Sequence, residues 1–138
     1  MGEVGVKLYL DASTIIYCIE GATPVRQKAL ARLIQAEGTT GGMLLTSRLS
    51  RLECRVKPLR DNNEAILATY EEFFTRGSLR VVEMGAAIVE RATELRVRYG
   101  VKTPDAIHLA TAVEGNADAF LTGDRDLCRC REIAVEVL

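Results

Sequence analysis

The sequence predicts an α/β fold in which helices cover both faces of a mainly parallel sheet. Short apolar runs with strand character alternate with longer helix-like segments along the whole chain. Strands separated by helices are joined by right-handed crossovers, which place the strands parallel in one sheet. The chain has 138 residues, 48% hydrophobic and 27% charged, a usual balance for a globular domain. This composition excludes disordered and collagen-like classes and predicts one domain over residues 1–138.

Five short apolar runs predict the strands, because each is too short for a helix and is bounded by polar or turn residues. In chain order the expected strands are 7–10, 43–46, 79–83, 119–122 and 134–137. Six longer segments with helix-like patterns fill the intervals between them, and one short helical segment is expected before the last strand. In chain order the expected helices are 13–20, 24–37, 48–56, 62–76, 85–99 and 104–114.

Capping residues and prolines set the expected limits of these helices. Thr23 and Thr103 each precede a proline, and Thr23 is expected to cap a helix whose first residue is that proline. Ser47 is expected to cap the third helix, which is interrupted near Pro58 because proline has no backbone N–H to donate. Asp61 is expected to start the fourth helix. Glycines follow most of the helices and are expected to end them.

The overall charge gives no sign of a nucleic-acid or membrane partner, because 18 basic residues balance 19 acidic ones. The N-terminal apolar stretch ends at Asp11 and is too short for a signal peptide or a membrane span. We therefore expect a cytoplasmic protein with no membrane partner, whose cysteines are free thiols. Cys128 and Cys130 lack the matching partners of a zinc site.

Four carboxylates stand at positions where a parallel sheet gathers its ligand-binding residues. Asp11 directly follows the first strand, and Asp124 closely follows the fourth. Asp105 lies in the first turn of the last long helix, and Glu53 lies near the middle of the third helix. Each residue alone is explained by a turn, a cap or the helix dipole. Together, beside apolar segments, they would repel one another unless a cation neutralised them, and an all-carboxylate set favours Mg²⁺ or Mn²⁺ over zinc.

Four sequence segments carry a family resemblance. LYLDAS, the carboxylate Glu53, PDAIHLATA and LTGDRDL resemble the motifs of the PIN-domain ribonucleases, especially the VapC-type toxins of bacteria and archaea. The resemblance covers nearly the whole chain and implies a three-layer α/β/α sandwich with a five-stranded parallel sheet. It also implies that Asp11, Glu53, Asp105 and Asp124 bind the metal and serve catalysis.

The activity implied by this resemblance is Mg²⁺-dependent hydrolysis of RNA that leaves a 5′ phosphate, with Mn²⁺ as a substitute metal. The biology implied is a toxin that is inhibited by a small antitoxin and forms a homodimer. Two departures from the family pattern concern the last motif. Gly123 stands where many relatives have Asn, and Asp126 is a second candidate for the role of Asp124.

Side chains next to the four acids are candidates for supporting roles. Ser13 and Thr122 are near two of the acids in sequence and are expected either to hydrogen-bond the metal ligands or to act as ordinary caps. His108, the only histidine, is expected to pack or to form hydrogen bonds rather than to bind metal or substrate.

A stripe of arginines on the third helix is a candidate RNA-binding surface. Arg48, Arg51 and Arg55 recur at helical spacing, so they share one face that either contacts phosphates or faces solvent. Helical geometry places Glu53 nearly opposite this stripe. Aromatic residues make up only 5% of the chain, which gives little support for recognition by base stacking.

Two alternatives to the nuclease remain open at this stage. The same fold can serve as a catalytically silent module that binds RNA or protein, although the presence of all four acids favours an enzyme. A receiver-like signalling domain also gathers acids at strand ends. The residue at the end of the third expected strand is Glu83, however, which is not the aspartate that such a domain phosphorylates.

Overall fold

The computed structural model describes residues 5–138, so the first four residues of the N-terminal stretch lie outside the described part. The described chain contains five strands, six α-helices and one short 3₁₀ helix. In chain order they are β1 (Lys7–Leu10), α1 (Ala12–Glu20), α2 (Thr23–Glu37), β2 (Met43–Ser47), α3 (Leu49–Arg60), α4 (Glu64–Phe74), β3 (Leu79–Val82), α5 (Ala86–Tyr99), α6 (Thr103–Glu114), β4 (Ala119–Thr122), η1 (Arg125–Arg129) and β5 (Val135–Val137).

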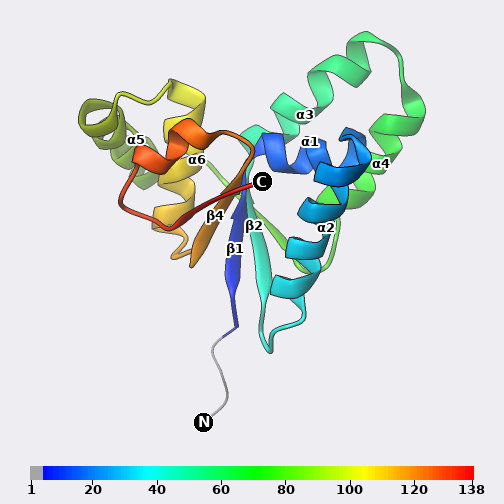
Figure 1. Cartoon of the computed structure of the whole chain (residues 1–138). Coiled ribbons are helices and arrows are strands. Elements are labelled where there is room, and N and C mark those ends of the chain that lie inside the picture. Colours follow the sequence, from blue (N-terminus) through cyan, green and yellow to red (C-terminus); the bar gives the residue numbers. More distant parts are fainter. Residues whose placement is uncertain (1–4) are drawn as a thin grey trace.

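The five strands form one sheet in the order β3-β2-β1-β4-β5, and every pair is parallel. β1 is the central strand, paired with β2 on one side and with β4 on the other. Helices α5 and α6 lie on one side of the sheet and helices α1 to α4 on the other (Figure 1). The predicted three-layer α/β/α sandwich with a parallel five-stranded sheet is therefore confirmed. The receiver-like alternative does not fit, because receiver domains have the strand order 2-1-3-4-5.

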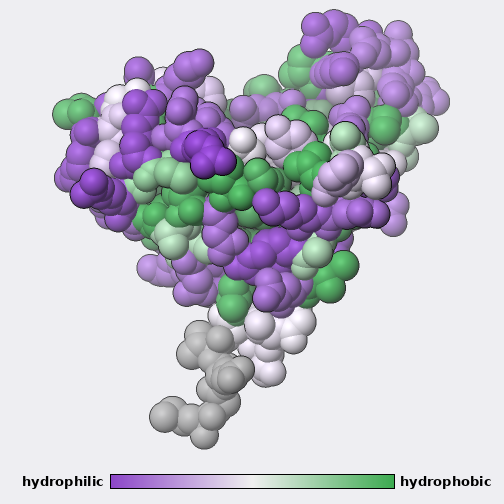
Figure 2. Space-filling view, in the orientation of Figure 1, coloured by the Kyte–Doolittle hydropathy of each residue, from purple (hydrophilic) through white to green (hydrophobic). Residues whose placement is uncertain are grey.

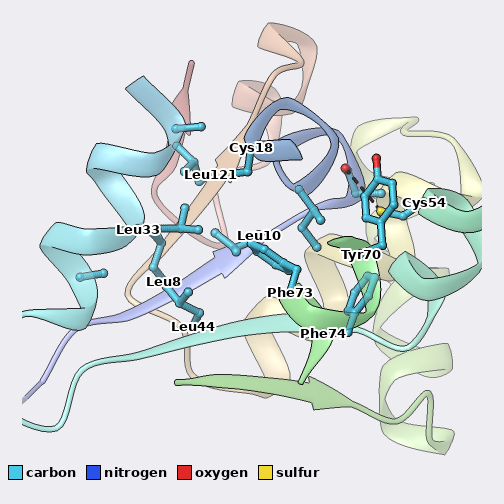
Figure 3. Close-up of a cluster of buried hydrophobic side chains, with 14 of the residues drawn as sticks. Leu8, Leu10, Cys18, Leu33, Leu44, Cys54, Tyr70, Phe73, Phe74 and Leu121 are labelled. Carbon is cyan, nitrogen blue, oxygen red and sulfur yellow. Dashed lines mark hydrogen bonds between the residues drawn. The ribbon is translucent and has the colours of Figure 1, made fainter. Parts of the chain in front are cut away.

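Two hydrophobic cores, one on each face, hold the helices to the sheet. Alternate residues of β1 point to opposite faces: Leu8 and Leu10 enter the core under α1, α2 and α4, whereas Tyr9 enters the core under α5 and α6. In the first core Leu33 and Phe73 pack towards these strand residues (Figure 3). Because both faces of the short strands are buried, the strands read as continuous apolar runs in the sequence.

The element order and most limits agree with the sequence-based expectations, and the differences lie at helix ends. Helix α3 is not interrupted at Pro58 but continues to Arg60. Pro58 lies in the last turn, where its missing N–H removes only one intrahelical hydrogen bond, and its ring is buried. Asp61 ends α3 rather than starting the next helix, because Asn62 reverses the chain at φ 51° and Asn63 accepts the capping hydrogen bond of α4.

The expected caps of two other helices were wrong in detail. Thr23 is the first residue of α2 rather than its cap; Ala22 occupies that position and makes no side-chain capping bond. Arg48 occupies the cap position of α3, although the Leu49 N–H still donates to Ser47 Oγ at 3.1 Å. Proline at the start of α2 needs no N–H partner, so a side-chain cap adds less there.

The carboxyl ends of the strands open between two helical lobes. The α3–α4 pair projects beyond the sheet on one side, and α5 and α6 lie on the other (Figure 1). The space-filling view shows a notch between two largely hydrophilic lobes at this end of the molecule (Figure 2). Within residues 5–138 no helix is long and apolar enough to cross a membrane.

Candidate active site

Asp11 is the most firmly held of the predicted site residues. It ends β1 and caps α1, and only 5% of its surface is exposed. Its Oδ1 accepts hydrogen bonds from Ser13 Oγ at 2.7 Å and from the Thr14 N–H at 3.0 Å. Its Oδ2 accepts from Thr122 Oγ at 2.6 Å. Three donors from two segments therefore fix the orientation of this carboxylate.

The loop after β4 is tied to the same place. Besides donating to Asp11, Thr122 Oγ accepts from the Asp124 N–H at 3.0 Å. The Gly123 N–H donates to Ser13 Oγ at 3.1 Å. Asp124 caps η1, and its Oδ1 accepts from the Asp126 N–H at 2.9 Å. These bonds bring Asp124 to the end of β1, and the structure therefore places both Ser13 and Thr122 against the carboxylate of Asp11.

Asp105 lies in the first turn of α6, half-buried and close to the other acids. Burial raises the pKa of Asp105, and the negative charge of Asp124 raises it further. Weaker contributions to the same increase in pKa come from Asp11 and Glu53, opposed by His108. Asp11, Glu53 and Asp124 are therefore all close enough to Asp105 to raise its pKa. Asp126 contacts this group of acids through its N–H, which donates to Oδ1 of Asp124.

Glu53 enters the site from α3 and is bound by the histidine of α6. Its Oε1 lies 2.6 Å from Nε2 of His108, whose Nδ1 lies 2.7 Å from the hydroxyl of Tyr9. His108 is buried, as the expected packing and hydrogen-bonding role requires. Tyr9 is fully buried, and its burial together with the charge of Asp11 raises the pKa of the phenol.

The gathered acids suit a hard divalent cation in their chemistry. Bringing carboxylates together raises the pKa of Asp105, and a bound cation would offset that repulsion. Carboxylate oxygen donors are typical of Mg²⁺ and Mn²⁺ ligands. Among residues 5–138, however, no three His, Cys, Asp or Glu side chains are already placed to hold one metal ion. The acids therefore have the ligand type and the negative charge that a divalent cation requires, but their side chains are spaced more widely than in a formed metal site.

Comparison with known protein families gives a match to the PIN domain, whose family model covers residues 8–133. The chain belongs to the PIN domain family. The match spans β1 from its second residue to the loop before β5, and so includes four of the five strands and every candidate acid of the site. Comparison with curated protein sequences gives no significant match.

Several solved structures share this fold. The PIN domain described here resembles VapBC2 of Rickettsia felis, solved with a DNA fragment from their promoter, with a TM-score of 0.76, 15% identity and coverage of 96% of this chain and 99% of that one. FitAcB of Neisseria gonorrhoeae gives a TM-score of 0.71 at 16% identity, with coverage of 93% of this chain and 95% of that one. VapC20 of Mycobacterium tuberculosis, described as a sarcin-ricin loop cleaving toxin, gives a TM-score of 0.68 at 18% identity. The match covers 87% of this chain and 92% of that one. At these identities the likeness concerns the fold.

The arginine stripe of this PIN domain lies away from the acids and is largely paired. Arg48 binds Glu83, and Arg51 binds Glu71 at 3.0 Å while its guanidinium stacks over a phenylalanine ring. Arg55 donates to the backbone carbonyl of Arg51 at 2.9 Å. The three arginines line a groove with apolar side chains of α3. This arrangement is less suited to phosphate contact than the sequence pattern suggested.

A contact at Gly123 leaves little room for a side chain at this position. A Cβ atom at Gly123 would lie 2.3 Å from Cε2 of Tyr17, a half-buried residue of α1. The tyrosine ring therefore occupies the space that a side chain at position 123 needs. Tyr17 and Tyr9 were not predicted as site residues, since neither is next to an acid in the sequence. The only signal for Tyr9 is the strand geometry itself, which turns successive side chains of β1 to opposite faces of the sheet.

Proposed function

We propose that residues 1–138 form a single metal-dependent endoribonuclease domain that acts as the toxin of a toxin–antitoxin pair. The observation that carries the proposal is the grouping of Asp11, Glu53, Asp105 and Asp124 at the carboxyl ends of β1, β2 and β4, in a chain that belongs to the PIN domain family. RNA as the substrate is supported by the likeness to VapC20, which its description names as a toxin that cleaves the sarcin-ricin loop.

The four acids differ in how firmly hydrogen bonds hold their carboxylates. Asp11, held by three donors, presents a carboxylate whose orientation does not change when substrate arrives. Asp105 and Asp124 lie at the opening, where an ionised carboxylate can accept a proton from the water that attacks phosphorus.

Mg²⁺, or Mn²⁺ as its substitute, bound by these four acids would polarise the phosphate and lower the pKa of water. A polyanionic substrate also requires such a cation, because the gathered carboxylates would otherwise repel the phosphodiester. Hydrolysis by water that expels the 3′ oxygen leaves a 5′ phosphate and needs no covalent intermediate with the chain.

An RNA cleavage assay tests this proposal. Purified protein is incubated with structured RNAs in Mg²⁺, Mn²⁺ or EDTA, beside Asp11→Asn and Asp105→Asn. The matched control is Asp61→Asn, which makes the same chemical change at an exposed residue in the turn after α3. We expect metal-dependent cutting that is lost in both site variants and retained in the control. Equal cutting by Asp11→Asn, Asp105→Asn and the wild-type protein would refute the assignment.

The alternative is a catalytically silent module that binds RNA or protein. It predicts RNA binding without cutting in either metal, and no effect of the two site substitutions on that binding. The assay above separates the two, because a silent module gives intact RNA in every lane.

A small antitoxin and a second copy of the chain are the protein partners that we propose. The exposed apolar side chains on α3 support a protein contact there: Leu52, Val56 and Leu59 are each at least half exposed and line the groove with Met84. Light scattering on the purified chain measures the dimer. A protein that is monomeric at all concentrations would refute the homodimer and leave the nuclease proposal intact.

A further inference from the structure

A buried chain of hydrogen bonds connects β1, α6 and α3 behind the candidate active site. It runs from the Tyr9 hydroxyl to Nδ1 of His108 and from Nε2 of His108 to Oε1 of Glu53, over 2.7 and 2.6 Å. Tyr9 has no exposed surface and His108 has 2%. Glu53 is the outer end of the chain, with 30% of its side chain exposed.

The direction of donation follows for an ionised Glu53 and a neutral imidazole. An ionised carboxylate only accepts hydrogen bonds, so the short contact with Glu53 requires the hydrogen on Nε2 of His108. In the neutral imidazole Nδ1 is then an acceptor, and it faces a hydroxyl that can donate. In this state the direction is Tyr9 to His108 to Glu53.

Packing holds the inner end of this chain in place. The ring of Tyr9 stacks on Phe120 with a centroid distance of 5.0 Å and an interplanar angle of 12°. It meets the imidazole edge-on at 5.9 Å and 65°. Because Tyr9 and Phe120 are paired residues of the adjacent strands β1 and β4, the imidazole packs against the interior of the sheet.

We propose that His108 is a positioning residue that holds Glu53 by one oxygen and leaves the other oxygen directed to the cation. Tyr9, by donating to Nδ1, supports the imidazole tautomer that Glu53 requires. The inference rests on the proposed function, because it assigns Glu53 a partner in metal binding. Glu53 has three side-chain torsions on a helix surface, and His108 removes that freedom before the cation arrives.

The tautomer is measured directly, because the chain has one histidine and its ring nitrogen signals are unambiguous. Nitrogen NMR at about pH 8, above the ordinary pKa of histidine, is expected to show the hydrogen on Nε2. In Tyr9→Phe that preference is expected to weaken. The matched control is Tyr70→Phe, which removes the hydroxyl of another fully buried tyrosine, one that donates to Glu20. A hydrogen on Nδ1 in the wild-type protein would overturn the proposal.

Binding of Mn²⁺ to the intact protein, followed by electron paramagnetic resonance without RNA, tests the positioning role. Loss of the donor in His108→Leu is expected to weaken Mn²⁺ binding about tenfold, the low end for such supporting residues. His108→Gln keeps an N–H donor at that position and is expected to recover part of the affinity.

A second background separates positioning from structural damage. In Glu53→Gln the carboxylate is already absent, so adding His108→Leu is expected to change Mn²⁺ affinity little further. Equal affinity of His108→Leu and the wild type, or an equal loss in both backgrounds, would refute the positioning role alone. A wild-type protein that neither binds Mn²⁺ nor cuts RNA would refute the proposed function, and the tautomer measurement would still report on the hydrogen-bond chain.

Discussion

Replacing Thr122 with valine tests how firmly the structure holds the Asp11 carboxylate. Valine has nearly the shape of threonine, so the substitution removes the hydroxyl and leaves the packing. Thr122 is fully buried, and its Oγ both donates to Asp11 at 2.6 Å and accepts from the Asp124 N–H at 3.0 Å. The variant therefore leaves a buried carboxylate oxygen and a backbone N–H each short of a partner.

The expected cost follows from these two bonds. A hydrogen bond to a charged group contributes about 1.5–3 kcal/mol to the free energy of unfolding, and an ordinary one about 1 kcal/mol. The sum is about 3 kcal/mol, a large part of the roughly 5–15 kcal/mol that stabilises a domain. With an unfolding entropy of about 2.1 cal/mol/K per residue, the melting temperature should fall by about 10 °C.

Urea denaturation at neutral pH, followed by circular dichroism, measures this difference. The matched control is Thr122→Ser, which keeps the hydroxyl and loses one buried methyl group, at a cost of about 1 kcal/mol. In an Asp11→Asn background the cost of Thr122→Val should shrink, because the acceptor is no longer charged. A valine variant as stable as the serine variant, or the same cost in both backgrounds, would show that the hydroxyl does not hold the carboxylate.

Three further predictions concern other parts of the chain. Gly123→Ala should cost about 1–3 kcal/mol of stability, because its Cβ would lie 2.3 Å from the ring of Tyr17, and most of that cost should disappear when Tyr17→Ala is added; strictly additive effects in urea denaturation would contradict this. Arg76 pairs with Glu37 at 2.6 Å and lowers the pKa of that carboxyl. Arg76→Met should therefore cost about 1 kcal/mol at neutral pH, a difference that shrinks as the pH falls below the ordinary value of 4.5 and Glu37 gains its proton; a deficit independent of pH would refute this account. Iodoacetamide should modify only Cys128 in the native protein, since the other three cysteines are buried; mass spectrometry that finds two or more adducts before unfolding would contradict the described burial.

The sequence predicted the fold because its signals are local. Apolar runs, prolines and glycines fixed the order of strands and helices, and the parallel sheet followed from the helices between strands. The errors came where one turn decides the outcome. Asp61 has the chemistry of a helix start, but the positive φ of Asn62 lies after it, so the new helix begins beyond Asn63. Asp61 and Asn63 are both residue types that favour a helix N-cap, so residue type alone does not show which of them caps α4.

The candidate site was predictable as a set of positions but not as a set of contacts. The rule that ligands gather at strand ends pointed to Asp11 and Asp124, the positions of Asp105 and Glu53 near other strand ends made them candidates too, and the family resemblance implied that all four bind the metal. The bond between Glu53 and His108 joins residues 55 apart in the chain, and that between His108 and Tyr9 joins residues 99 apart. Such pairs depend on how α3, α6 and β1 pack, which no local pattern records.

The central position of β1 makes the candidate site depend on contacts between distant parts of the sequence. Leu8 pairs with Ala119 across the sheet, and the bond from Thr122 to Asp11 joins residues 111 apart. Because a chain is synthesised from its N-terminus, Asp11 can gain this bond only after residue 122 has left the ribosome. Contacts of such long sequence separation are expected to form late and to slow the folding of the domain.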